Sequence, residues 1–342
     1  MVEYDVTIGI PFYRSVDTIR QTLESALSQT YESIEFLLID DAGEDGSMAI
    51  VQHLKQHHLR GQDVRIISHE HNMGVAASRN EIIDKAKGEF LFFLDSDDVI
   101  EVNTISLLMD QTRKHDAEAV FGSYEKVELD GRKTICQYPF MRFTEPDRLA
   151  TFAYRQYGGI QASACNYIVK TSLLRKNRHR FLNSNYWEDL VFTFDLVTFV
   201  SRAVLLPDVT YSYRCRPDSL SHYQQRENIS KEEIMQTVQT IDHLKNCSPD
   251  IISKSYYPNR CFQIAMTDFY IACRVLKLGS RIVPIVMNSE IKQIMKHPAT
   301  IRQICSFRQS KVKNLFMCLI GKLPAFYCVF IVWCLGKAKK LI

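Results

Sequence analysis

The stretch from Gly88 to Val99 reads Gly-Glu-Phe-Leu-Phe-Phe-Leu-Asp-Ser-Asp-Asp-Val. Its short apolar run, Phe90 to Leu94, is rich in aromatic residues and predicts a strand that is buried on both faces. Three carboxylates, Asp95, Asp97 and Asp98, follow this strand. Ligands of open parallel sheets bind beyond the carboxyl ends of the strands, and buried carboxylates need a positive partner. The stretch therefore indicates either a site for a divalent metal that carries phosphates or a solvated acidic turn.

Strand and helix patterns alternate in the residues before this stretch. Short β-branched and apolar runs predict strands at Tyr4 to Ile10, Ile34 to Ile39 and Val64 to Ser68. Apolar residues at helical spacing predict helices between the strands, the first capped by Ser15 and the last ended by Gly88. This alternation predicts βαβ units and an α/β fold with a mostly parallel sheet.

Polar and charged residues follow several of the predicted strands, so they collect at one edge of the sheet. The first strand is expected to end at Pro11, and the turn after it has neither a GxGxxG motif nor a P-loop. A nucleotide would therefore be held in another way. Asp40 or Asp41 can accept hydrogen bonds from a base or a ribose, and Arg79 can pair with phosphate or stack on a base.

Composition limits the class of protein. The chain has 342 residues, 46% of them hydrophobic and 24% charged, which suits two domains or one large domain with an appendage. Its net charge of +3 gives no support for nucleic-acid binding. The ten cysteines begin at Cys136 and include no CxxC pair, and the first residues lack the pattern of a signal peptide. We therefore expect a reducing, cytoplasmic compartment.

Five segments form an ordered set of motifs within about the first hundred residues. They are Ile8-Gly-Ile-Pro-Phe-Tyr-Arg14, Leu27-Ser-Gln-Thr-Tyr31, Ile39-Asp-Asp-Ala-Gly-Glu-Asp-Gly-Ser47, Asn72-Met-Gly-Val-Ala-Ala-Ser-Arg-Asn80 and Phe93-Leu-Asp-Ser-Asp-Asp98. This set resembles the family 2 glycosyltransferases of bacterial surface-polysaccharide synthesis. The resemblance implies a GT-A fold, which is Rossmann-like, with helices on both faces of the sheet. Where the family has Asp-Asp-Gly-Ser this chain has Asp-Asp-Ala-Gly, which keeps both carboxylates.

The resemblance also implies a role for each matching residue. Asp97 would bind Mg²⁺ or Mn²⁺ directly, and Asp95 would approach the ribose, the metal or a metal-bound water. The cation would bridge the two phosphates of a nucleotide sugar and stabilise the departing nucleoside diphosphate. The residues implied to hold that nucleotide sugar are Pro11, Tyr13, Asp40, Asp41, Arg79, Asp95 and Arg214.

Residues 101–225 carry a second group of candidates. Strand patterns follow one another directly at Ala119 to Val127 and Lys133 to Tyr138, without a helix between them. This change marks the half of the fold that usually shapes the acceptor site. Glu188 and Asp189 begin a helical pattern, where acidic residues also favour the helix dipole. By resemblance, Asp189 is the general base that takes a proton from the acceptor hydroxyl during an inverting displacement. Glu188 would then orient the acceptor or Asp189.

The segment from Ala203 to His222 completes the implied site. It predicts two short strands, 203–207 and 209–214, followed by the loop Arg-Cys-Arg-Pro-Asp-Ser-Leu-Ser-His. This loop resembles the Tyr-x-Tyr-Arg…Ser segment of the family. The resemblance implies that Arg214 or Arg216 holds the diphosphate and that His222 is a further metal ligand or phosphate contact. A solvated loop histidine is the alternative.

We expect a catalytic domain at residues 1–225, with a nucleotide-sugar half at 1–100 and an acceptor half at 101–225. The rest of the chain has a different character. Residues 226–310 have helical patterns, the last at Ile282 to Lys296, and predict a helical appendage. Residues 311–342 contain six lysines and no acidic residue, and residues 323–336 carry no charge. This apolar run is shorter than the roughly twenty residues of a bilayer span. We expect a basic tail on the inner face of the cell membrane, with a buried terminal helix as the alternative.

These observations predict an inverting, metal-dependent glycosyltransferase of polysaccharide biosynthesis. Its donor would be a nucleotide-diphosphate sugar and its acceptor a hydroxyl of a glycan or a lipid-linked glycan. A sugar nucleotidyltransferase is a weaker alternative, because it needs a Gly-rich, Arg-bearing loop after the first strand. A non-catalytic, membrane-attached binding protein on a transferase scaffold would have no need of both Asp97 and Asp189.

Overall fold

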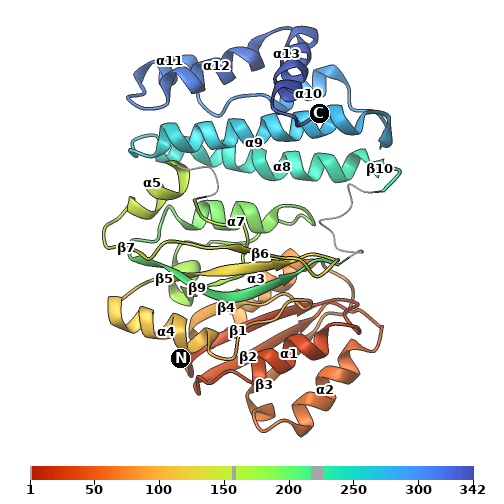
Figure 1. Cartoon of the computed structure of the whole chain (residues 1–342), viewed down its shortest axis with the longest axis vertical. Helices are drawn as coiled ribbons and strands as arrows, with labels where there is room; N and C mark the ends of the chain where they lie inside the picture. The colour runs from red at the N-terminus through yellow and green to blue at the C-terminus, as the bar shows by residue number, and fades with distance from the viewer. Residues whose placement is uncertain (1, 156–158, 217–225) are drawn as a thin grey trace. The chain divides into compact units, whose positions relative to one another are not determined.

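The computed structural model describes residues 2–155, 159–216 and 226–342. Two compact units make up the chain (Figure 1). Unit 1 consists of Met1–Leu149 and Ala162–Ser219, and unit 2 consists of Ala150–Gln161 and Leu220–Ile342.

The first half of unit 1 is a parallel sheet. Its strands lie in the order β3-β2-β1-β4, with bounds β1 (Tyr4–Phe12), β2 (Ile34–Asp40), β3 (Val64–Ser68) and β4 (Gly88–Phe93). The connecting helices are α1 (Ile19–Leu27), α2 (Ser47–His57) and α3 (Val75–Lys85). The last seven residues of β1 and the first six of β2 are buried, as expected for strands with both faces covered.

The second half of unit 1 makes the sheet mixed, with nine strands in the described part of the chain. β8 (Tyr167–Lys170) pairs antiparallel with β4 and with β5 (Ala119–Val127), and β9 (Ala203–Arg214) runs parallel to β5. β6 (Lys133–Cys136) and β7 (Met141–Phe143) pair antiparallel with β5 and β9. The helices of this half are α4 (Thr104–His115), the first residues of α5 (Arg148–Arg155), α6 (Thr171–Lys176) and α7 (Glu188–Leu196).

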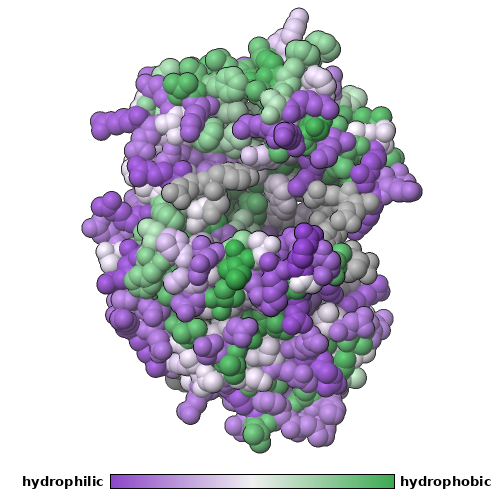
Figure 2. Space-filling view, viewed as in Figure 1, coloured by the Kyte–Doolittle hydropathy of each residue, from purple (hydrophilic) through white to green (hydrophobic). Residues whose placement is uncertain are grey.

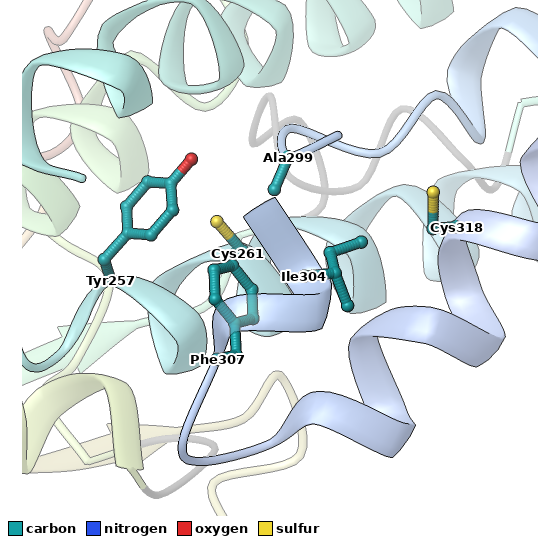
Figure 3. Close-up of a cluster of buried hydrophobic side chains, with 6 residues drawn as sticks. All are labelled: Tyr257, Cys261, Ala299, Ile304, Phe307 and Cys318. Carbon is teal, nitrogen blue, oxygen red and sulfur yellow. The ribbon is translucent and has the colours of Figure 1, made fainter. Parts of the chain in front are cut away.

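In its described residues, unit 2 is helical apart from the two-stranded pair β10 (Ile229–Ser230) and β11 (Ile282–Val283). Its helices are α8 (Lys231–Cys247), α9 (Tyr257–Leu278), α10 (Asn288–Ile294), α11 (Ile301–Ser306), α12 (Lys311–Lys322) and α13 (Ala325–Ala338). Figure 3 shows a core cluster in which α9, α11 and α12 meet, formed by Tyr257, Cys261, Ala299, Ile304, Phe307 and Cys318. The predicted α/β fold with a helical C-terminal region is confirmed.

Several local predictions were wrong for identifiable reasons. β1 continues through Pro11 to Phe12. Its pairing with β4 stops at Gly9, so the missing N–H of Pro11 breaks no hydrogen bond to β4. Gly88 begins β4, and α3 ends earlier, at Lys85.

Two further predictions failed at prolines. The two short strands predicted around Pro207 are one strand, β9, whose pairing with β5 shifts register near this proline. The helix predicted from Ile282 is interrupted by Pro284, so β11 comes first and α10 begins at Asn288.

Candidate active site

The acidic loop after β4 is joined to β9 through Asp98. This carboxylate is 1% exposed and accepts hydrogen bonds from the Tyr211 hydroxyl (2.7 Å) and from the backbone N–H of Arg214 (2.8 Å). Burial, together with the charges of Asp97 and Asp95, raises the pKa of Asp98 well above its usual range. Both oxygens of Asp98 are engaged, so its function is to hold the loop in place.

Asp95 and Asp97 keep access to solvent from the same loop. The Asp97 carboxylate accepts a hydrogen bond from Arg216 Nε (2.8 Å), and Arg216 Nη2 lies 2.5 Å from the same oxygen. Burial and the neighbouring Asp95 charge raise the pKa of Asp97, and Arg216 opposes this shift. Asp97 is thus paired with Arg216, and Asp95 pairs with a second arginine, Arg79.

Arg79 of α3 connects this loop to the second acidic motif. Its buried guanidinium donates from Nη2 to Oδ1 of Asp95 and from Nη1 to Oε1 of Glu188, both over 2.7 Å. The same group lies 5.3 Å from the ring centroid of Phe181. Sequence reasoning placed Arg79 against a base or a diphosphate; in the structure two nitrogens of its fork bind protein carboxylates.

Glu188 and Asp189 form the first turn of α7. Trp187 precedes them with φ of 62°, a left-handed conformation that starts the helix abruptly. Asp189 Oδ1 accepts the N–H of Leu190 (2.7 Å). Burial, and next the charge of Glu188, raise the pKa of Asp189 to about 7, while Arg79 acts in the opposite direction. A carboxylate with that pKa is suited to take up a proton near neutral pH.

The Asp40-Asp41 pair at the end of β2 divides into two roles. Asp41 is buried and accepts hydrogen bonds from the N–H groups of Met73 (2.7 Å) and Gly74 (2.8 Å) and from His69 Nδ1 (2.7 Å). Gly74 has φ of 88°, which a residue with a side chain rarely adopts, so this glycine shapes the start of α3. Asp41 therefore anchors α3.

Asp40 remains partly exposed, and among the described residues its carboxylate accepts one long hydrogen bond, 3.4 Å, from the N–H of Gly43. His69, the other partner of Asp41, also contacts Glu81 through Nε2 (2.8 Å). Sequence reasoning missed His69, because a lone histidine after a short strand carries no motif.

Hydroxyl groups tie the first turn to the acidic loop. Ser15, which the sequence predicted as a helix cap, instead shares a hydrogen bond of 2.8 Å with Ser96, and its N–H donates to Ser47 Oγ (2.9 Å). α1 begins after Thr18 with no side-chain cap. Pro11 is buried at the end of β1, and Tyr13 is exposed with the Arg14 guanidinium 5.2 Å from its ring centroid.

The remaining candidates lie around this group. The side chain of Arg214 donates to Gln21 Oε1 (2.6 Å), so it leans toward α1. His222 lies outside the described residues. In the described part of the chain, no cluster of three or more His, Cys, Asp or Glu side chains is arranged to hold a metal ion. The structure thus brings together Asp95, Asp97, Arg79, Glu188 and Asp189, with Asp41 at the base of α3.

Comparison with known proteins identifies the family. Residues 7–176 match the family described as Glycosyl transferase family 2. The chain belongs to this family. The glycosyltransferase is 29% identical over 220 residues to "Glycosyltransferase GlyG" of Streptococcus pneumoniae, which covers 63% of this chain and 72% of the relative. It is also 29% identical over 237 residues to the Escherichia coli "UDP-Glc:alpha-D-GlcNAc-diphosphoundecaprenol beta-1,3-glucosyltransferase WfaP". That match covers 68% of this chain and 86% of the relative.

A solved structure confirms the GT-A fold of the glycosyltransferase. The crystal structure of S. aureus TarS residues 1–349 in complex with UDP-GlcNAc superposes with a TM-score of 0.66, at 18% identity, over 93% of this chain and 90% of that chain. At that identity the likeness concerns the fold alone. The family assignment favours the predicted transferase over the sugar nucleotidyltransferase and over a binding protein.

Proposed function

We propose that this glycosyltransferase moves a sugar, with inversion, from a nucleoside-diphosphate sugar to a hydroxyl of a lipid-linked glycan. One observation carries the proposal: Arg79 joins the acidic loop after β4 to the Glu188-Asp189 pair of α7. A donor-binding motif and a potential base are thereby held at one edge of the sheet.

The substrate classes rest on the relatives. The UDP-GlcNAc complex of TarS and the UDP-Glc donor in the name of WfaP support a nucleoside-diphosphate sugar as the donor. The name of WfaP also specifies an acceptor sugar on diphosphoundecaprenol. We infer an acceptor of the same class, a glycan attached to a lipid diphosphate, and a role in polysaccharide biosynthesis.

The carboxylates that face solvent fit Mg²⁺ or Mn²⁺ held jointly with the donor. Mg²⁺ is commonly bound through one or two carboxylates together with substrate phosphates. Asp97 and Asp95 supply two carboxylates, whereas Asp98 is engaged by Tyr211 and Arg214. Arg216 would have to leave Asp97 for that carboxylate to bind a cation. When bound, the cation would neutralise charge on the diphosphate leaving group.

Asp189 is the proposed general base. It accepts the proton of the acceptor hydroxyl as the hydroxyl oxygen forms a bond to the anomeric carbon. The bond from that carbon to the diphosphate breaks, and its electron pair leaves with the nucleoside diphosphate. A single displacement of this kind inverts the anomeric configuration. Glu188, held by Arg79, keeps the start of α7 in position and raises the pKa of its neighbour.

The donor-binding roles follow from which side chains remain available. Tyr13 and Asp40 are the proposed nucleoside contacts, beside the buried Pro11. Asp41 and Arg79 position other groups, because both oxygens of Asp41 and both terminal nitrogens of Arg79 bind within the protein. Arg214 and Arg216 are the proposed contacts of the diphosphate, since the backbone of Arg214 and the side chain of Arg216 both bind the acidic loop.

A membrane surface is the proposed partner of the C-terminal helices. Exposed apolar residues form two stripes at the same helical spacing, Val312, Phe316 and Leu319 on α12 and Phe326, Phe330 and Trp333 on α13. Figure 2 shows hydrophobic residues gathered over this part of the chain. The six lysines between residues 311 and 342 would meet anionic lipid headgroups. None of the described helices is long and apolar enough to cross a membrane.

Nucleotide titration tests the donor site. UDP, GDP, CDP and dTDP are titrated calorimetrically into the protein, with Mn²⁺ and with EDTA. We expect metal-dependent binding of one diphosphate, weakened at least about tenfold by Asp97→Ala. Asp110→Ala, which removes an exposed carboxylate from α4, is the matched control and should bind like the wild type. Failure of all four to bind to the folded protein would refute the proposed donor site.

A further inference from the structure

Unit 2 contains a cavity that the proposed transfer chemistry does not use. Its volume is about 580 Å³, within the range of roughly 300–1,000 Å³ typical of small-molecule sites. The lining residues come from α5, α9, α12, α13 and the segments next to them, and all belong to unit 2.

The wall of this cavity is mainly apolar. Its apolar residues are Phe262, Met266 and Phe269 of α9, Phe316 and Met317 of α12, and Leu335 of α13. Phe316 also belongs to the exposed stripe of α12, with half of its surface accessible. The apolar lining is therefore continuous with the surface that we propose for membrane contact.

The charged side chains that line the cavity are all positive in the described part of the chain. Arg155, Lys313 and Lys339 line it and are exposed, and no Asp or Glu is among the described residues of its lining. None of these three cations forms a salt bridge within the described ranges. Lys313 Nζ lies 5.3 Å from the ring centroid of Phe262, so this ammonium sits directly beside the apolar wall.

The uncharged polar groups of the lining bind to one another. Ser310 Oγ donates to Asn259 Oδ1 (2.7 Å), and Gln263 Nε2 donates to the carbonyl oxygen of Tyr154 (3.3 Å). The ligand that fits this lining has a long apolar part and an anionic end, because burial of a chain releases water from the walls and phosphate forms charge-assisted hydrogen bonds with Lys and Arg.

We propose that the cavity binds the apolar chain of a single phosphate-bearing lipid, with the phosphate at Arg155, Lys313 and Lys339. The inference rests on the proposed function, because the lipid would come from the membrane at which the transferase would work. A chain ending in phosphate is common to a bilayer phospholipid and to an isoprenoid carrier.

Calorimetry with dodecyl phosphate, kept below its critical micelle concentration, tests the site in the full chain. We expect one molecule to bind per chain. Inorganic phosphate and dodecyl maltoside should each bind at least about tenfold more weakly, because each lacks one half of the required chemistry. Farnesyl phosphate in a parallel titration distinguishes an isoprenoid chain from a straight one by which of the two binds more tightly.

Three variants locate the binding. Met266→Trp fills the cavity and should abolish binding, and Lys313→Ala/Lys339→Ala should weaken it about tenfold or more. The matched control, Lys311→Ala/Lys340→Ala, removes two neighbouring lysines that do not line the cavity and should bind within about twofold of the wild type. Equal weakening in both lysine pairs, or unchanged binding in a Met266→Trp protein with a wild-type circular dichroism spectrum, would overturn the proposal.

Two further readouts separate this proposal from the proposed function. Met266→Trp should keep wild-type binding of the nucleoside diphosphate, which takes place in unit 1, and wild-type sedimentation with anionic vesicles. If the wild-type protein binds dodecyl phosphate but binds no nucleoside diphosphate or no vesicles, the proposed function is refuted and the lipid site in the cavity still stands. The reverse pattern would refute the cavity alone.

Discussion

Nη1 of Arg79 donates a hydrogen bond to Oε1 of Glu188 over 2.7 Å, across 109 positions of sequence. Because Nη2 of the same side chain donates to Asp95, one buried guanidinium fixes the distance between the loop after β4 and the start of α7. The proposed base and the proposed metal-binding loop are thus positioned before any substrate arrives.

Removal of this guanidinium should destabilise the protein. Arg79→Ala leaves Glu188 and Asp95 without their buried partner, which costs about 3–5 kcal/mol when such a pair is broken. Urea denaturation followed by circular dichroism measures the loss. Arg180→Ala, which breaks an exposed pair with Asp84, is the control, with an expected cost of about 0–1 kcal/mol. Similar losses in the two variants would contradict the bridging role of Arg79.

Asp189→Asn should abolish most turnover while donor binding persists. Loss of a general base typically costs about 10²–10⁴-fold in rate. Sugar transfer and calorimetric binding of the nucleoside diphosphate are measured side by side. Asp195→Asn on the same helix should keep near wild-type turnover, since nothing in the proposal uses its carboxylate. A fully active Asp189→Asn would mean that the base lies elsewhere.

The pH profile of turnover should follow Asp189. Its pKa of about 7 means that the carboxylate is increasingly protonated, and so inactive as a base, as the pH falls below neutrality. kcat should therefore rise with pH, with a midpoint near 7. Glu188→Gln removes a negative charge that raises this pKa, so the midpoint should move to lower pH. A midpoint that moves upward, or stays in place, would argue against this pair.

The buried Asp268 of α9 should make stability depend on pH. Burial raises its pKa to about 8, and Lys245, whose Nζ lies 3.0 Å from Oδ2, opposes the shift. Between the unfolded pKa of about 3.9 and this value, the native state holds a proton that the unfolded chain has released. The free energy of unfolding should therefore fall as the pH rises through that window.

Asp268→Asn should flatten this dependence in urea titrations at several pH values. Asp242→Asn removes the more exposed carboxylate that also contacts Lys245 and should leave the slope in place. A slope that is the same in the wild type and in Asp268→Asn would assign the pH dependence to other groups.

Membrane binding should depend on the stripe of α13. Deletion of residues 311–342 is a poor test, because Cys318 and Val332 are buried in unit 2. Replacing Phe326, Phe330 and Trp333 by Ser leaves these buried residues in place and should weaken sedimentation with anionic vesicles about tenfold or more. The control replaces three exposed apolar residues of unit 1, Leu59, Ile135 and Phe140, by Ser. Equal loss in both triple variants would argue against a dedicated surface.

The sequence predicted most of the fold because the patterns are local. The bounds of β3 and β5 match their predicted ranges, since β-branched and apolar runs there end at turn residues. Proline positions were less predictable. Pro11 lies inside β1 and Pro207 inside β9, because the effect of a missing N–H depends on whether a neighbouring strand pairs at that position.

The candidate site was predictable as a set of residues, and less so as a set of contacts. Asp95, Asp97 and the Glu188-Asp189 pair carry recognisable motifs. The roles of Arg79 and Asp41 depend on partners far along the chain, Glu188 for the first and His69 with α3 for the second. Tyr211, which holds Asp98, lies in the segment resembling Tyr-x-Tyr-Arg, which was the one available signal.

The pairing of β5 with β9 has a consequence for the order of events during synthesis. Strands β1 to β4 are complete at Phe93, and domains form from the N-terminal side as the chain emerges. The groups that satisfy Asp98 come from Tyr211 and Arg214, and the counter-charge of Asp97 comes from Arg216. A nascent chain that has emerged through Asp98 therefore carries two carboxylates, Asp97 and Asp98, whose partners are not yet made, whereas Asp95 can already pair with Arg79. We expect the last strand, β9, to close the folding of unit 1 and to assemble its active-site loop in the same step.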